Sequence, residues 1–147
     1  MDQALRAHAL RLLARREHSR AELARKLAPY APSPQALSAL LEDLVARKQL
    51  SDERYAEARA RALARKFGGA RIRHELRSKG VAAEIADTFS SGGDLERARA
   101  ILERRYRAPA ATREERAKRA RFLQARGFST EVILRLIADA SSSGDSG

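Results

Sequence analysis

The chain has 147 residues and a net charge of +11, with 30 Lys and Arg against 19 Asp and Glu. Aromatic residues make up only 5% and Trp is absent, which favours helices over a sheet built on aromatic and β-branched side chains. The lack of Cys excludes a disulfide scaffold and thiolate metal sites and suits a reducing cytosol, and no stretch reaches the ~18 apolar residues of a membrane span. The first ten residues carry Arg6 and His8 in place of an apolar run, so we expect a cytoplasmic protein without a secretory signal.

The first fifty residues predict three helices. An amphipathic helix is indicated around Leu5 and Leu12, and Ser19 with Glu22 has the spacing of a capping box, in which each side chain binds the other's backbone N–H. Ser33 and Pro34 suit the cap and the first position of a third helix. The apolar stripe of that helix is Leu37, Leu40, Leu41, Leu44 and Val45. We therefore predict a three-helix repeat at residues 1–50.

Two further sets of three helices follow, at residues 51–93 and 94–140. In the second set, Gly80 is expected to end a helix in the left-handed conformation, and Ile85 and Phe89 are expected to face inward. In the third, Thr112 and Glu115 form a second capping box, Gly127 ends a helix and Ser129 caps the last one. The small, polar segment 141–147 is predicted to be a disordered tail.

One phrase is written twice. The segments RHELRSKGVAAEI (residues 73–85) and ARFLQARGFSTEV (120–132) align Leu76 with Leu123 and Gly80 with Gly127. A phrase that recurs at the same junction of successive helix sets is typical of a repeat array. We predict an all-α fold, an elongated and curved tandem array of three three-helix repeats; the alternative is one nine-helix globule in which the phrases coincide by chance.

The positive charge is shared almost evenly among the three predicted repeats. It therefore belongs to the folded length of the chain and indicates an extended polyanionic partner such as nucleic acid or a nucleoprotein. The alternative for any single arginine is a solvated or ion-paired surface group. The candidate basic surface of the second and third repeats is Arg59, Arg61, Arg65, Lys66, Arg71, Arg73, Arg77, Lys79, Arg104, Arg105, Arg107, Arg113, Arg116, Lys118, Arg119, Arg121 and Arg126. The first-repeat candidates are Arg15, Arg16, Arg20, Arg25 and Lys26.

Aromatic and histidine residues limit the other functions. Four phenylalanines, at positions 67, 89, 122 and 128, lie at helix ends or junctions and are interpreted as core, whereas Tyr55 and Tyr106 fit either surface or core. Without free stacking platforms, direct DNA binding should be weak and sequence-independent. His8, His18 and His74 are isolated from one another and are expected at the surface. No nucleotide-binding or metalloprotease motif occurs, so we expect neither an enzyme nor a cofactor or metal.

The sequence resembles the RecX family of bacterial RecA regulators. The resemblance rests on LARREHSRAELARKL in the first repeat, LSDERYAEARARALARKFGGARIRHELRSKGV in the second and RFLQARGFSTEVI in the third. It implies a monomer that binds along the groove of the RecA–DNA filament and inhibits the ATPase and strand exchange of RecA, modulating recombination and DNA repair in the SOS response. Weak contact with single-stranded or double-stranded DNA would accompany this. The alternatives are a helix-turn-helix-like protein that acts on DNA directly and a helical array with another protein partner.

Overall fold

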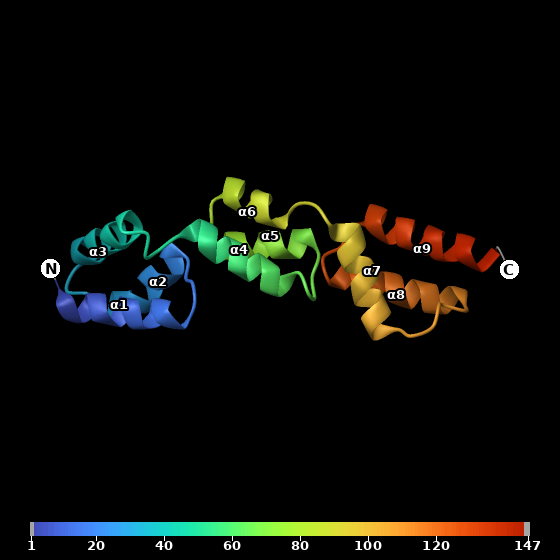
Figure 1. Cartoon of the computed structure of the whole chain (residues 1–147), viewed down its shortest axis with the longest axis horizontal. Helices are drawn as coiled ribbons and strands as arrows, with labels where there is room; N and C mark the ends of the chain where they lie inside the picture. Colours follow the sequence, from blue (N-terminus) through green and yellow to red (C-terminus); the bar gives the residue numbers. More distant parts are fainter. Residues whose placement is uncertain (1, 146–147) are drawn as a thin grey trace. The chain divides into compact units, whose positions relative to one another are not determined.

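The computed structural model describes residues 2–145, and their side chains as far as residue 137. Over this range the chain forms nine α-helices and one 3-10 turn without any strand (Figure 1). The α-helices are α1 (Gln3–Arg15), α2 (Arg20–Leu27), α3 (Pro34–Ala46), α4 (Asp52–Leu63), α5 (Gly69–Ser78), α6 (Ala83–Ser90), α7 (Asp94–Arg105), α8 (Arg113–Ala125) and α9 (Thr130–Asp145), and the 3-10 turn is Ala28–Tyr30. The predicted all-α class is confirmed.

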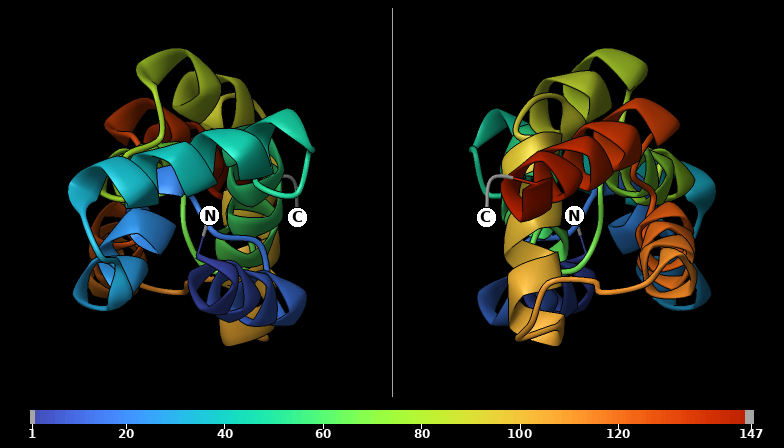
Figure 2. Two further views of the ribbon diagram at one scale, coloured as in Figure 1. Left: turned by 90° about the vertical axis from the view of Figure 1, so that its left-hand side faces the viewer. Right: turned by 90° about the vertical axis from the view of Figure 1, so that its right-hand side faces the viewer.

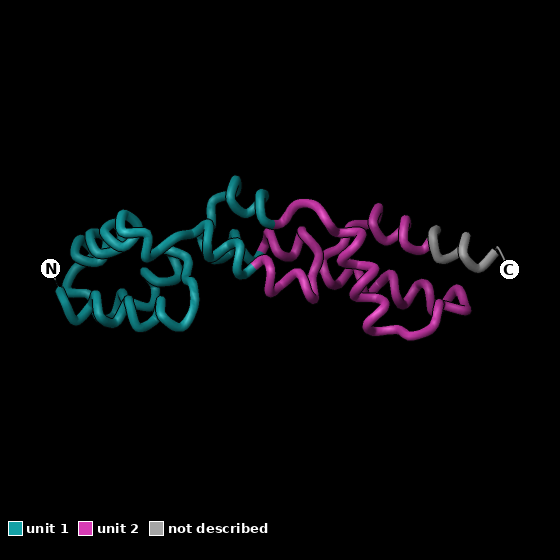
Figure 3. The backbone as a smooth tube through the Cα atoms, in the orientation of Figure 1, with its two compact units in different colours: residues 1–59, 75–89 teal, residues 60–74, 90–147 magenta. Residues whose placement is uncertain are grey.

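The chain divides into two compact units (Figure 3). Unit 1 consists of residues 1–59 and 75–89, and unit 2 consists of residues 60–74 and 90–147. The division therefore falls inside α4, inside α5 and before the last residue of α6. Residues 60–74 belong by sequence to the second predicted repeat, but they pack within the unit that contains the third.

The amino-terminal core of unit 1 is built by three short helices. Helix α2 packs against both α1 and α3, and α1 and α3 lie on opposite sides of this bundle (Figures 1 and 2). Helices of this length are marginal alone in water, so burial of their leucines supplies most of the stability. The buried residues are Leu5, Ala9, Leu23, Leu27, Leu40, Leu41, Leu44 and Leu50. Val45, expected in the same stripe, is instead 44% exposed.

Both predicted caps in the first fifty residues form. Ser33 Oγ accepts the backbone N–H of Ala36 at 3.0 Å, and Ser19 Oγ accepts that of Glu22 at 3.0 Å. The carboxylate of Glu22, however, takes two hydrogen bonds from Arg16, at 2.7 and 3.1 Å. Because Glu22 is buried, a charged donor satisfies it better than the neutral N–H that the capping box predicts. Burial acts to raise the pKa of Glu22, but Arg16, with His18 and Lys26, lowers that pKa below its usual value overall.

His18 is buried, at 2% exposure, so its predicted surface position is wrong. Its Nδ1 lies 3.1 Å from the carbonyl oxygen of Arg16, and its Nε2 lies 3.0 Å from Lys26 Nζ. An ammonium group can only donate, so Nε2 accepts, Nδ1–H donates and the ring is neutral. Burial lowers the pKa of His18, and the charges of Arg16 and Lys26 lower it further against the opposing hydrogen bond to the Arg16 carbonyl.

The free energy of unfolding is expected to fall as the pH drops through the range in which His18 becomes protonated. An unfolded histidine titrates near ~6.5, and the pKa of folded His18 is lower. As the pH falls, His18 is therefore protonated in the unfolded chain before it is protonated in the folded chain. The stabilisation that His18 contributes is complete above pH ~6.5 and is lost as the pH falls toward the folded pKa. The measurement is the thermal midpoint between pH 7.5 and 5.5. His18→Gln should flatten this dependence, whereas His74→Gln, at an exposed site, should keep it; equal slopes in both variants would contradict the assignment.

Unit 2 has its own core under α9, which packs against α7 and α8. The buried residues are Ala98, Ile101, Leu123, Phe128, Ile133 and Leu136. Thr112 caps α8 through the N–H of Glu115 at 3.1 Å, but the glutamate reaches the N–H of Ala111 at 2.7 Å rather than that of Thr112. Ser129 caps α9 through the N–H of Val132 at 3.2 Å. Helix α9 is assigned as far as Asp145, further than the expected end of the third repeat at 140, and residues 146–147 lie outside the described residues.

The glycine of the repeated phrase has the same conformation at both places. Gly80 has φ +84°, which confirms its predicted left-handed conformation. Gly127, predicted only to end a helix, has φ +91° and is also left-handed. Each glycine also allows a close approach within its unit. A Cβ on Gly80 would lie 2.5 Å from Ala21 Cβ, and one on Gly127 would lie 2.5 Å from Arg71 Cβ. The repeated phrase therefore marks a helix end that packs tightly against another segment.

Candidate nucleic-acid interface

The candidate basic residues are divided between the two units. Unit 1 contains Arg15, Arg16, Arg20, Arg25, Lys26, Arg59, Arg77 and Lys79. Unit 2 contains Arg61, Arg65, Lys66, Arg71, Arg73, Arg104, Arg105, Arg107, Arg113, Arg116, Lys118, Arg119, Arg121 and Arg126. Most of the predicted surface thus lies in unit 2.

Several cations of unit 1 have internal partners. Arg16 is paired with Glu22 at 2.7 Å, and Arg59 Nη2 lies 3.4 Å from Glu75 Oε1. Arg77 Nη1 donates to the carbonyl oxygen of Val81 at 2.8 Å, a residue in the turn before α6. A cation paired with a carboxylate stabilises its own unit and has less charge to offer a phosphate. Arg16 and Arg59 are therefore weaker candidates than their sequence positions suggest.

Unit 2 contains a pocket lined by Arg65, Lys66, Arg104 and Ala62, with a volume of about 480 Å³. Helix α4 ends at Leu63, where the N–H of Lys66 binds the Leu63 carbonyl at 3.0 Å, and the turn that follows contains Arg65. Arg104 comes from the last turn of α7, and its Nη2 donates to the carbonyl oxygen of Arg65. This bond fixes one guanidinium group at the turn. We call Arg65, Lys66 and Arg104 the basic pocket.

The basic pocket suits an anion with several oxygen atoms. No carboxylate lines it, and within the described part of the chain none of its three cations is ion-paired. Like charges that face one pocket repel each other, and a bound anion removes that cost. A phosphate group, with charge and acceptors on every side, matches such a site.

Three aromatic residues of unit 2 contact arginine side chains. Phe67, Tyr106 and Phe122 are half-buried, and guanidinium groups pack against all three rings. The core assignment of Phe67 and Phe122 is therefore only partly right, whereas that of Phe128, which is 4% exposed, is confirmed. The neighbouring arginines in the sequence, such as Arg71 four residues after Phe67, were the available signal.

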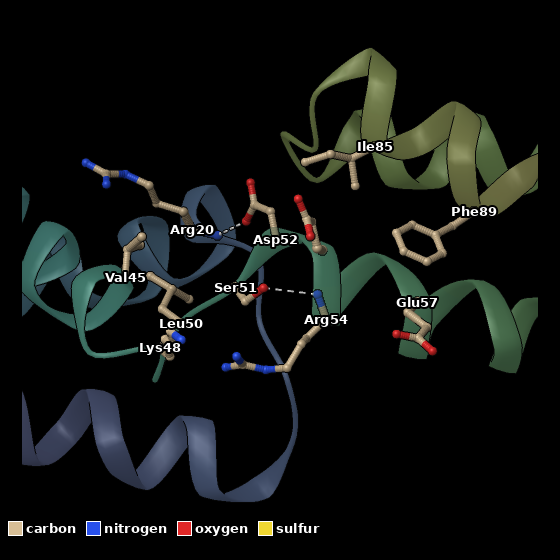
Figure 4. A pocket seen from close by; sticks show the side chains of 11 residues that line it. Arg20, Val45, Lys48, Leu50, Ser51, Asp52, Arg54, Glu57, Ile85 and Phe89 are labelled. Atoms are coloured by element: carbon tan, nitrogen blue, oxygen red, sulfur yellow. Dashed lines mark hydrogen bonds between the residues drawn. The ribbon is translucent and has the colours of Figure 1, made fainter.

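A second concave surface lies in unit 1, between α4, α6 and the end of α3 (Figure 4). It has a volume of about 680 Å³ and includes Val45, Ile85 and Phe89. Ile85 and Phe89, expected to face inward, are half-buried at its edge. Asp52 accepts the backbone N–H of Arg20 at 2.7 Å here. The lining mixes acidic, basic and apolar side chains, so it lacks the uniform positive charge of the basic pocket.

Within the described residues, no group of three His, Asp or Glu side chains is placed to bind a metal ion. Over the same residues no helix is both long enough and apolar enough to cross a membrane.

The comparisons with known proteins agree along most of the chain. Residues 51–88 match the sequence model of the second three-helix domain of RecX, and residues 93–137 match that of the third. Regulatory protein RecX of Leptothrix cholodnii is 47% identical over 136 residues, which cover 90% of this chain and 87% of that protein. The chain belongs to the RecX family. The matched ranges lie close to the second and third predicted repeats.

Other RecX proteins extend this relation. Regulatory protein RecX of Herbaspirillum seropedicae is 47% identical over 132 residues, covering 88% of this chain and 86% of that protein. The crystal structure of RecX from Lactobacillus salivarius superposes with a TM-score of 0.74 at 22% identity and covers 94% of this chain and 95% of that chain. The identity to the solved structure is low, so that comparison supports the shared RecX fold alone.

Proposed function

We propose that this chain is a non-enzymatic, cytoplasmic regulator of the RecA recombinase, which binds along the groove of the RecA–DNA filament and suppresses its ATPase and strand exchange. The observation that carries this proposal is the 47% identity to a regulatory protein RecX across 90% of the chain. That relative is named a regulatory protein, which supports a regulatory role. RecA is proposed as the regulated protein because the sequence resembles the RecX family of RecA regulators.

The charge and the repeat organisation support a filament as the partner. A filament presents recombinase subunits and DNA phosphates again and again along one direction. A chain with several linked modules can contact successive positions, and each contact after the first becomes intramolecular. Affinity for the filament should therefore exceed affinity for a short stretch of naked DNA. The basic pocket is the best supported phosphate contact, because its cations converge without a carboxylate in the lining.

The proposal is tested by adding the full chain to RecA filaments assembled on single-stranded DNA and following ATP hydrolysis. We expect hydrolysis to fall as the chain is added, and strand exchange to fall with it. Hydrolysis that stays constant, while the chain is folded and present in excess over RecA, would reject the proposed regulation. The full chain at high salt serves as a control, because screening should weaken the inhibition.

A further inference from the structure

Arginine and aromatic side chains alternate in unit 2 as a continuous series of contacts. The series links the turn after α4, helix α5, the end of α7 and helix α8. We call it the Arg–aromatic ladder. Its members, in order of contact, are Arg71, Phe67, Arg126, Phe122, Arg105, Tyr106 and Arg119.

The first two rings each have two guanidinium groups against them. The Cζ atom of Arg71 lies 4.7 Å from the centroid of the Phe67 ring, and that of Arg126 lies 5.5 Å from it. The same Arg126 lies 5.0 Å from the Phe122 centroid, with Arg105 at 4.4 Å. All four distances fall within the ~6 Å at which a cation is attracted to an aromatic ring. Arg126 therefore joins the two rings.

The third ring continues the series. Arg105 lies 5.8 Å from the centroid of Tyr106, and Arg119 lies 4.2 Å from it. The rings of Tyr106 and Phe122 meet edge to face, with centroids 6.4 Å apart and planes at 88°. This contact holds the two rings in a fixed orientation. Contact with both rings therefore restricts the otherwise flexible side chain of Arg105.

The ladder positions its arginines without neutralising them. An aromatic face attracts a guanidinium group but accepts none of its in-plane N–H bonds in the way a carboxylate does. None of the four arginines pairs with a carboxylate in the described part of the chain. Among the four, Arg119 also donates a hydrogen bond from Nη2 to the Ala108 carbonyl oxygen at 2.9 Å. Arg71 and Arg105 are exposed, so their N–H donors can reach a ligand in solvent. Because the rings already hold both side chains, binding should cost little further side-chain entropy.

We propose that the Arg–aromatic ladder is a binding track for the phosphodiester backbone of nucleic acid. Two guanidinium groups that share a ring lie within roughly 10 Å of each other, while phosphates follow at ~3.4 Å of rise along a strand, so one short stretch of backbone reaches several of them. The basic pocket extends the track, because Arg65 and Lys66 precede Phe67 and Arg104 precedes Arg105 in the sequence.

The ladder also defines how nucleic acid is recognised. Phe67, Phe122 and Tyr106 each already carry two guanidinium groups, so their faces are not free platforms for bases. Phosphate contacts by themselves carry no sequence information. Binding to the track should therefore be independent of base identity. This inference deepens the proposed function by naming the surface that meets the nucleic acid, but it concerns a property of this chain without recombinase.

The test uses the full chain, a fluorescent oligothymidine strand and no recombinase, so failure of the RecA proposal leaves its outcome unchanged. The ladder variant is Arg71→Lys, Arg105→Lys and Arg126→Lys, which keeps every charge and removes the planar fork. The matched control is Arg11→Lys, Arg47→Lys and Arg135→Lys, at exposed arginines outside the candidate basic surface. We expect the ladder variant to bind about tenfold more weakly, and the control to stay within about twofold, because lysine loses the stacked, bidentate geometry. Equal affinities of the two variants would overturn the proposal.

Two further arms separate the source of the phosphate and the role of the bases. An abasic strand of the same length should bind like oligothymidine; a tenfold loss on the abasic strand would show base stacking and overturn the backbone track. The ladder variant should also bind a duplex of the same length more weakly than the native chain does, by a similar factor, since a duplex presents the same phosphates. If the triple variant unfolds more readily, Arg105→Lys alone is compared with Arg135→Lys, and a difference of about two- to threefold is expected. No difference in that pair would also count against the track.

Discussion

Gly127→Ala is expected to destabilise the protein far more than Gly92→Ala. Both glycines have positive φ angles, +91° and +80°, so an L side chain is strained at either site. They differ in their surroundings. A Cβ on Gly127 would lie 2.5 Å from Arg71 Cβ and 2.9 Å from the Arg71 backbone nitrogen, whereas a Cβ on Gly92 would meet nothing within 4 Å. The pair therefore separates the cost of the left-handed backbone from the cost of the close approach.

The expected free-energy loss is about 1 kcal/mol for Gly92→Ala, from conformation alone. For Gly127→Ala a further ~1–3 kcal/mol is expected, because the clash involves backbone and Cβ atoms that cannot swing aside. The measurement is urea denaturation followed by circular dichroism, with both variants compared with the native chain. Equal losses in the two variants would mean that α5 does not pack against Gly127 as the structure has it.

Reversing the charge of the basic pocket is expected to remove most of the inhibition of RecA. The variant is Arg65→Glu, Lys66→Glu and Arg104→Glu, and the readout is the concentration of protein that halves ATP hydrolysis by filaments. We expect this concentration to rise at least about tenfold, since three phosphate contacts become repulsive. A single reversal is a poor test, because one exposed charge contributes little.

The matched control reverses Arg11, Lys48 and Arg135, which are exposed, lie outside the candidate basic surface and lower the net charge by the same amount. This variant should remain within about threefold of the native chain if position matters more than net charge. The thermal midpoint of both variants is measured first, because Arg104 also donates to the Arg65 carbonyl. Equal loss of inhibition in well-folded variants would show that no specific role belongs to the basic pocket.

The local features of the fold could be predicted because they depend on residues close in sequence. Ser33 and Ser129 bind backbone N–H groups three residues ahead, and the left-handed glycines end the helices that precede them. The partner of Glu22 could not be predicted by the same kind of rule. A spacing rule compares only the two positions of the capping box, whereas Arg16 lies before the helix and bears the stronger donor.

The parts that sequence could not supply depend on contacts between distant segments. The burial of His18 follows from Lys26 and from the packing of the α1–α2 turn, where Ser19 Oγ also donates to the Lys79 carbonyl at 2.7 Å. The basic pocket and the ladder likewise need the turn after α4 beside the end of α7. Composition indicated a basic surface, but it could not separate Arg104 from Arg59, whose charge is paired with Glu75.

The central claim is that this chain acts on the recombinase filament and not on DNA or on free RecA. The most direct measurement is its binding to three targets at several salt concentrations: RecA filaments on single-stranded DNA, RecA alone and the naked strand. We predict the tightest binding to filaments, weaker binding to the naked strand and the weakest to RecA alone, with filament affinity falling steeply as salt rises. Binding to the naked strand that equals binding to filaments would contradict this account and would identify a protein that acts on DNA directly.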